Sequence, residues 1–254
     1  MSSFLSPSDP FANVTPLSRE ETIAWIDTTG EHRMRTVGPE CKEIDLEAAH
    51  RIRDTNRYQH KRNYEGKYWC AGTRRHVWYE SMTEYSAIMH LDHTSRLTAL
   101  TAQPCWIRFK DGMSHYPDFF AEHANGSRVL YDVKPRKYID DKTEYVFSRT
   151  ADVCAAIGWG YEIIHELGRI ERHNLEWLAA YRHPWNAPSA ETVNQIATFM
   201  TERRPLEHVA QLLHFYRPAK FIHHVYHLMW QRQLSYDNRL PISWETELIW
   251  KTDA

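Results

Sequence analysis

The alternation of apolar and polar residues divides residues 80–165 into segments with the periods of helices and strands. Residues 80–91 (ESMTEYSAIMHL) have helical spacing, which places Ala87, Ile88 and Leu91 where they can face a core. The remaining segments predict strands over residues 97–109, 115–123, 128–133 and 159–165, and a helix over residues 142–157. The predicted order of helix, three strands, helix and strand indicates a mixed α/β core.

After Gly168 the pattern becomes helical, and prolines punctuate the segments in the way that proline marks helix starts. We expect helices over residues 170–182, 189–203, 205–215 and 219–232. Residues 234–250 then predict two short strands around Asp237-Asn238. Three short helices followed by a hairpin indicate a mainly helical, winged-helix-like domain.

The N-terminal residues differ from both of these regions. Residues 1–17 are rich in Ser and Pro, which indicates a loose arm. Ser18-Arg19-Glu20-Glu21 has the spacing of a capping box and predicts a short helix through Asp27. Three parts follow from these patterns: an arm with a short helix over residues 1–49, an α/β core over 50–167, and the helical domain over 168–254.

Composition sets broad limits on the function. The 254 residues are 42% hydrophobic and 25% charged, as in ordinary globular proteins, and the net charge of −2 excludes a uniformly basic nucleic-acid coat. We expect no membrane span, because no apolar run approaches about 18 residues, and no signal peptide. The four cysteines are widely scattered without a CxxC pair, so neither a zinc ribbon nor a disulfide framework is indicated, and we expect a cytoplasmic location.

Charge is concentrated locally in residues 50–76. Eight basic and two acidic residues give this segment a balance of +6, with tyrosines and a tryptophan interleaved. Basic charge mixed with aromatic rings suits contact with the phosphates and sugars of nucleic acid, and a solvated surface is the alternative interpretation. The candidate DNA-binding residues are Arg51, Arg53, Lys61 and Arg62.

The strongest chemical signal is Pro117-Asp118, followed after thirteen residues by Asp132-Val133-Lys134. Residues two apart on a strand share a face, so Asp132 and Lys134 point the same way. Mg²⁺ prefers hard oxygen ligands, and two converging carboxylates supply them. Lys134 beside the carboxylates could orient the attacking water and offset charge that develops on a phosphate.

The turn between the two strands tests whether the carboxylates converge. A two-residue turn at Asn125-Gly126 would set Asp118 opposite Val133, on the wrong face. A three-residue loop, Ala124 to Gly126, sets Asp118 opposite Asp132. That loop needs a left-handed residue at its last position, and Gly126 occupies it. His115 has the opposite strand parity to Asp118, so we do not expect it to act as a base.

A glutamate on the preceding helix is the expected fourth element. Glu80 and Glu84 are four residues apart and therefore share a helical face, so either could reach the metal. An acidic triplet with a lysine also arises by chance, and a solvated acidic edge is the alternative for this helix. The Pro-Asp step, the strand context, the turn and the upstream glutamates together favour a catalytic site.

These motifs resemble, in order and spacing, the TnsA-like endonuclease subunit of heteromeric transposases. The resemblance covers roughly residues 65–167. The matching motifs are Tyr79-Glu80-Ser81-Met82-Thr83-Glu84, Gln103-Pro104, His115-Tyr116-Pro117-Asp118-Phe119 and Asp132-Val133-Lys134-Pro135.

The resemblance implies a restriction-endonuclease-like fold of the PD-(D/E)xK group and a metal-dependent endodeoxyribonuclease. It favours Glu84 over Glu80 and implies catalytic roles for Glu84, Asp118, Asp132 and Lys134. The three acids would hold Mg²⁺, for which Mn²⁺ could substitute, and Gln103 would line the site.

The implied partners are DNA, a DDE-type transposase subunit that cuts the other strand at transposon ends, and an AAA+ ATPase regulator. Two alternatives stay open. The chain could be a stand-alone restriction or repair nuclease, or a DNA-binding adaptor whose nuclease site is idle.

Overall fold

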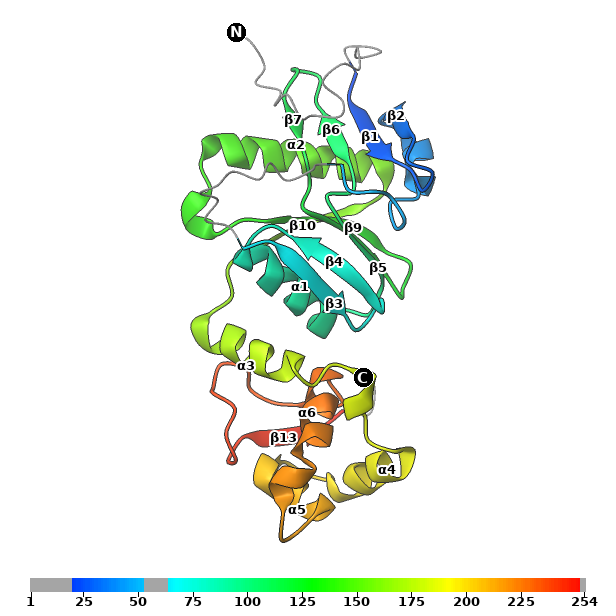
Figure 1. Ribbon diagram of the computed structural model, residues 1–254. Coiled ribbons are helices and arrows are strands. Elements are labelled where there is room, and N and C mark those ends of the chain that lie inside the picture. The colour runs from blue at the N-terminus through cyan, green and yellow to red at the C-terminus, as the bar shows by residue number, and fades with distance from the viewer. Residues whose placement is uncertain (1–19, 53–63, 252–254) are drawn as a thin grey trace. The chain divides into compact units, whose positions relative to one another are not determined.

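The computed structural model describes residues 20–52 and 64–251, which form two compact units (Figure 1). The first unit comprises the described residues up to Ile88 together with Ser95–Glu166. The second comprises Met89–Thr94 and the residues from Leu167 onward. The chain is thus a mixed α/β protein with several small sheets, as the sequence pattern predicts.

The first unit is built on a four-stranded mixed sheet with the order β10-β9-β8-β5. Strand β8 is antiparallel to β5 and β9, whereas β10 is parallel to β9. The parallel pair requires a long crossover connection, and helix α2 provides it. The elements are β5 (Leu97–Ala102), β8 (Phe119–His123), β9 (Arg128–Val133), α2 (Asp141–Ile157) and β10 (Gly160–Ile164).

Helix α2 confirms its predicted position to within one residue. It begins after Asp140, whose carboxylate accepts a hydrogen bond of 2.8 Å from the Thr143 N–H. It ends at Gly158, which has the left-handed φ of +87° that closes many helices. The helix packs against β10 and β7.

Helix α1 (Met82–Thr94) contributes its first seven residues to the first unit. Ala87, Ile88 and Leu91 are buried, as their spacing predicts. Tyr85 packs edge-on against two tyrosines of the hairpin formed by β3 (Gly66–Cys70) and β4 (Arg75–Tyr79). This hairpin lies within the basic segment and was not predicted.

A second sheet of the first unit has the order β2-β1-β6-β7. Its strands are β1 (Thr22–Ile26), β2 (His32–Thr36), β6 (Trp106–Arg108) and β7 (Ser114–His115), and a short 3-10 helix, η1 (Pro39–Glu43), follows β2. The predicted helix through Asp27 is therefore wrong, because residues 22–26 form a strand paired on both sides. Its sequence, TIAWI, is rich in β-branched and aromatic side chains that suit a buried strand.

Two predicted strands are each divided between the sheets. Residues 97–109 leave the first sheet at Gln103, which has a left-handed φ of +47°, and enter the second at Trp106. Residues 115–123 likewise start in β7 and resume in β8 after Pro117. An apolar core that contains Ile23, Phe120 and Leu130 fills the space around these strands.

After Leu167 the second unit forms four helices, each shorter than predicted: α3 (Arg169–Ala179), α4 (Ala190–Phe199), α5 (Leu206–Leu213) and α6 (Ile222–Trp230). Its small sheet has the order β11-β13-β12, with β11 (Arg204–Pro205), β12 (Leu234–Ser235) and β13 (Glu247–Trp250). Short 3-10 helices precede α4 and α6: η3 (Pro184–Asn186) and η4 (Pro218–Lys220). Within the described part of the chain, no helix combines the length and apolarity needed to cross a membrane.

Candidate active site

The hairpin of β8 and β9 brings the two predicted aspartates together. Phe119 pairs with Tyr131, so the same register continued by one residue sets Asp118 opposite Asp132. The connection is the three-residue loop, because the backbone N–H of His123 donates to the Ser127 carbonyl at 2.9 Å. Gly126 at the end of this loop has a φ of +78°. The loop chemistry in the sequence thus correctly predicts the register.

Asp118 is held at the end of β9 in a strongly acidic environment. The Val133 N–H donates to its Oδ2 at 2.7 Å. Burial raises the pKa of the Asp118 carboxyl well above its usual range, and the charges of Asp132 and then Glu84 raise it further. Glu80 adds a smaller effect in the same direction. The site therefore collects negative charge that an approaching cation would relieve.

Asp132 is buried and receives two hydrogen-bond donors that the sequence analysis missed. The His115 Nε2 lies 2.9 Å from Oδ1 and 2.7 Å from Oδ2 of Asp132. The Tyr161 hydroxyl donates to Oδ2. Burial, followed by the Asp132 charge, raises the pKa of the Tyr161 phenol, so this hydroxyl keeps its proton and remains a donor.

The opposite strand parity assigned to His115 is wrong, because its ring contacts the Asp132 carboxylate. It rested on counting parity along one strand from His115 to Asp118, but the structure breaks that strand at Pro117. Tyr161 could have been found from topology. Ile163 pairs with Asp132 in the parallel register, and Tyr161, two residues earlier, shares its face.

Lys134 directly follows β9 and lines the same cleft as both aspartates. Its N–H donates to the Ile164 carbonyl at 3.0 Å, and its carbonyl lies 2.8 Å from the His165 Nδ1. The cleft has a volume of about 400 Å³. Its other lining residues come from β7, β9 and the start of α2: His115, Val133, Asp140, Lys142, Thr143, Val146 and Phe147.

The Ser-x-x-Glu motif forms a capping box at the start of α1. Glu84 Oε1 accepts the Ser81 hydroxyl at 2.9 Å, and Oε2 accepts the Glu80 N–H at 2.8 Å. In return, the Glu84 N–H donates to Ser81 Oγ at 3.2 Å. The Oε1 of Glu80 instead lies 3.9 Å from the Nη1 of Arg51. Glu84 thus has a structural role at this helix end, whatever its role in catalysis.

The donor set fits a divalent cation only in part. Asp118 and Asp132 are hard oxygen donors on one face, with charge repulsion between them. Within residues 20–52 and 64–251, no group of three or more His, Cys, Asp or Glu side chains converges as a metal site. Both carboxylate oxygens of Glu84 accept hydrogen bonds at the start of α1.

Gln103 and Arg51 lie near these residues but have other contacts. The Gln103 N–H donates to the Asp118 carbonyl at 2.8 Å, which ties the end of β5 to the Pro-Asp step. The Gln103 side chain is buried and does not line the cleft. Arg51 stacks its guanidinium 4.7 Å from the Trp78 ring centroid, so it is directed into the fold. The other candidate DNA-binding residues, Arg53, Lys61 and Arg62, lie outside the described residues.

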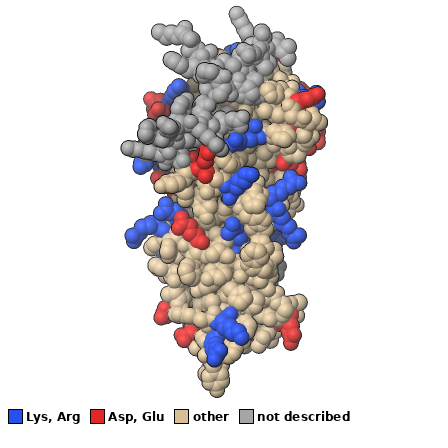
Figure 2. Space-filling model, in the orientation of Figure 1, with Lys and Arg blue, Asp and Glu red and all other residues tan. Residues whose placement is uncertain are grey.

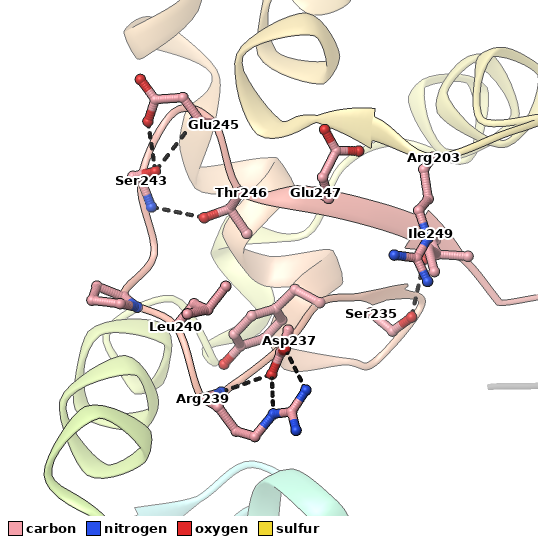
Figure 3. A pocket seen from close by; sticks show the side chains of 12 residues that line it. Arg203, Ser235, Asp237, Arg239, Leu240, Ser243, Glu245, Thr246, Glu247 and Ile249 are labelled. Carbon is pink, nitrogen blue, oxygen red and sulfur yellow. Dashed lines mark hydrogen bonds and ion pairs between the residues drawn. The ribbon is translucent and has the colours of Figure 1, made fainter.

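A larger pocket in the second unit lacks a comparable arrangement (Figure 3). It has a volume of about 640 Å³ and lies along the loop between β12 and β13. Asp237 binds Arg239 at 2.7 Å, and Glu245 accepts the Ser243 hydroxyl at 2.7 Å. The Arg239 bond lowers the pKa of Asp237 to about 2. These acids are thus paired with near neighbours in the loop, which leaves the cleft at Asp118 as the better candidate.

The fold and this cleft together define a mixed α/β protein with paired aspartates and a lysine at the ends of adjacent strands. No protein-family model matches the chain, and no curated protein matches it significantly.

Proposed function

We propose that this protein is a metal-dependent DNA endonuclease that hydrolyses phosphodiester bonds. The observation that carries the proposal is the register of β8 and β9, which sets Asp118 opposite Asp132. Lys134 opens into the same cleft. Two acids that could hold a divalent cation, with a lysine in the same cleft, suit phosphodiester hydrolysis.

The order of elements supports a restriction-endonuclease-like core. Helix α1 is followed by the antiparallel strands β5, β8 and β9, then by α2 and the parallel strand β10. This order agrees with the fold implied by the resemblance to TnsA-like endonucleases. In the second unit, the order α4, β11, α5, α6, β12, β13 and the central place of β13 in its sheet support a winged-helix-like domain.

Each residue of the cleft has a defined part in this proposal. Asp118 and Asp132 would hold Mg²⁺ or Mn²⁺, with Glu84 as the third acid. The bound cation would supply Lewis-acid stabilisation of the phosphate and lower the pKa of water. His115 and Tyr161 orient the Asp132 carboxylate. Lys134 places a positive charge where it can offset charge developing on the phosphate oxygens.

Plasmid nicking with Mg²⁺ or Mn²⁺ tests the proposal. We expect wild-type cleavage, and its loss in Asp118→Asn and Lys134→Met. Asp111→Asn is the matched control, because Asp111 is an exposed acid that does not line the cleft. Circular dichroism would verify that each variant is folded. Retained cleavage in folded Asp118→Asn would overturn the proposed site.

The resemblance further supports a role at transposon ends, where this subunit would cut one strand beside a DDE-type transposase under an AAA+ ATPase. Cleavage of plain DNA without partners would favour the stand-alone nuclease. The second candidate is a DNA-binding adaptor with an idle nuclease site. Isothermal calorimetry with Mn²⁺ distinguishes a nuclease from this adaptor, because an idle site would bind no metal at Asp118.

A further inference from the structure

The turn that follows Lys134 carries an exposed cluster of cations and an aromatic ring. Pro135 leads into a single 3-10 turn, η2 (Arg136–Tyr138). All three residues of η2 are exposed, and the Tyr138 side chain is 59% exposed. The Lys137 Nζ lies 4.8 Å from the centre of the Tyr138 ring. This ring contributes little to any apolar core, so packing does not explain its presence.

The backbone of η2 is fixed, although its side chains face solvent. The Arg136 N–H donates to Glu166 Oε2 at 2.8 Å, and the Tyr138 N–H donates to the Pro135 carbonyl at 2.9 Å. Lys134, at the other end of Pro135, is anchored to β10 through the Ile164 carbonyl. The turn is therefore held in a constant position beside the cleft.

The cations of this region make no ion pair in the part of the fold that the structure describes. Arg136, Lys137 and the cleft-lining Lys142 have no ion-pair partner within 4.0 Å among the residues that the structure describes. The nearby acid Asp140 instead accepts the Thr143 N–H and hydroxyl at the start of α2. On the face shown in Figure 2, basic and acidic side chains are interspersed. The three cations thus have no ion pair within the described residues, although Glu166 lies near Arg136: the bond from the Arg136 N–H, and then the Arg136 charge, lower the pKa of Glu166.

We infer that η2 and Lys142 form a phosphate-binding strap, which holds a DNA strand as it runs past the cleft. The inference rests on the proposed nuclease function and names the contact with its substrate. Arg136, Lys137 and Lys142 would neutralise backbone phosphates without reading sequence. The Tyr138 ring would stack on a base or sugar, as exposed aromatics do in sequence-tolerant binding of single strands. This strap would hold the substrate without drawing on the acids, which repel it.

DNA affinity across a KCl series tests the strap, measured by fluorescence anisotropy of a short labelled DNA in EDTA, so that no cleavage occurs. The double variant Arg136→Ala/Lys137→Ala should flatten the plot of log affinity against log salt by about 2 units, since each lost phosphate contact contributes about 0.9. The charge-matched control Arg96→Ala/Lys110→Ala removes two exposed cations that do not line the cleft, and should leave the slope unchanged.

A second pair of variants tests the aromatic contact. Tyr138→Ala should weaken binding of single-stranded DNA at least fivefold, and Tyr138→Phe should restore it, because stacking needs the ring and not the hydroxyl. An unchanged salt slope in the Arg136→Ala/Lys137→Ala variant would overturn the strap while wild-type cleavage still supports the nuclease. If the wild-type protein binds DNA through the strap but does not nick plasmid, the strap is supported and the nuclease function is rejected.

Discussion

The Nε2 of His115 lies 2.7 Å from Oδ2 of Asp132, although the two residues belong to different sheets. Tyr161 donates to the same oxygen from β10. Asp132 is therefore oriented from two sides by side chains that themselves need not touch the substrate. Groups that orient a metal ligand in this way commonly alter metal affinity or activity by 10- to 100-fold, roughly, when removed.

We expect Tyr161→Phe and His115→Ala each to weaken Mn²⁺ binding and lower cleavage by about tenfold or more, while the fold is retained. His115→Gln keeps an N–H donor and should recover part of the loss. His123→Gln is the control, since His123 bonds the Tyr131 hydroxyl at 3.1 Å, away from the cleft. Calorimetry for Mn²⁺ alone supplies a readout separate from activity. Equal Mn²⁺ affinity in wild type and Tyr161→Phe would contradict a positioning role.

The capping box on α1 allows the structural and catalytic roles of Glu84 to be separated. Ser81→Ala removes the cap and should cost about 1 kcal/mol of unfolding free energy, with cleavage retained. Glu84→Gln can still accept the Ser81 hydroxyl but loses its charge, so it should remain stable and lose cleavage. Urea denaturation and plasmid nicking measure the two effects. If Glu80→Gln is the inactive variant and Glu84→Gln cuts normally, Glu80 is the metal-side glutamate.

Gly126 sets the register of the catalytic hairpin through its backbone. An added Cβ would meet nothing within 4 Å, so Gly126→Ala acts only through its φ of +78°. We expect a loss of roughly 1–2 kcal/mol in unfolding free energy, and a smaller loss for Gly126→Asn, because Asn adopts this region more readily. Gly30→Ala, at a φ of +84° in another hairpin, is the matched control. Cleavage should fall only in the Gly126→Ala variant, and an equal fall in both would contradict a register effect.

His93 should make the second unit sensitive to mild acid. Burial lowers the pKa of His93 to about 4, while its Nδ1 lies 2.9 Å from the Trp230 carbonyl. His93 is neutral in the folded and unfolded states above the ordinary pKa near 6.5, so its protonation adds no pH dependence to stability there. As the pH falls below about 6.5 the unfolded chain takes up the proton first, and stability is lost progressively down to about pH 4.

The whole effect of His93 amounts to about 3 kcal/mol at most, from a shift of roughly 2.5 pKa units. We expect His93→Gln to be less stable than wild type at pH 7.5 and to lose less stability between pH 6.5 and 4.5. Thermal unfolding at both pH values checks this, and the comparison cancels the contribution of other histidines. If wild type and His93→Gln lose the same stability between the two pH values, the low pKa assigned to His93 is contradicted.

The sequence predicted those features of the site that depend on local rules. The three-residue loop followed from Gly126, and the shared face of Asp132 and Lys134 followed from the period of a strand. The helices α1 and α2 were predicted from apolar spacing and lie within about a turn of the structure. Each of these features is determined within fewer than twenty residues of chain.

The features that sequence could not provide depend on contacts between distant segments. Residues 22–26 are a strand because β2 and β6 pair with them on both sides, which overrides the helical start signal before Thr22. His115 reaches Asp132 because Pro117 interrupts the strand and moves β7 into the other sheet. Parity counting has no means of detecting such a change of sheet. The hairpin of β3 and β4 was missed because its segment was interpreted by charge, as a nucleic-acid contact or a solvated surface, and not by its strand pattern.

The mixed topology around β9 also sets an order in which the cleft can form. The β8–β9 hairpin closes through three residues, and hairpins form in about 1–10 µs. The parallel partner β10 can join only after the chain through α2 has been made and docked, and such non-local pairing is slow. We therefore expect Asp118 and Asp132 to meet early in folding, before Tyr161 arrives to hold the second carboxylate. Until β10 docks, the folding chain would have Asp118 and Asp132 side by side without the Tyr161 hydroxyl that donates to Asp132.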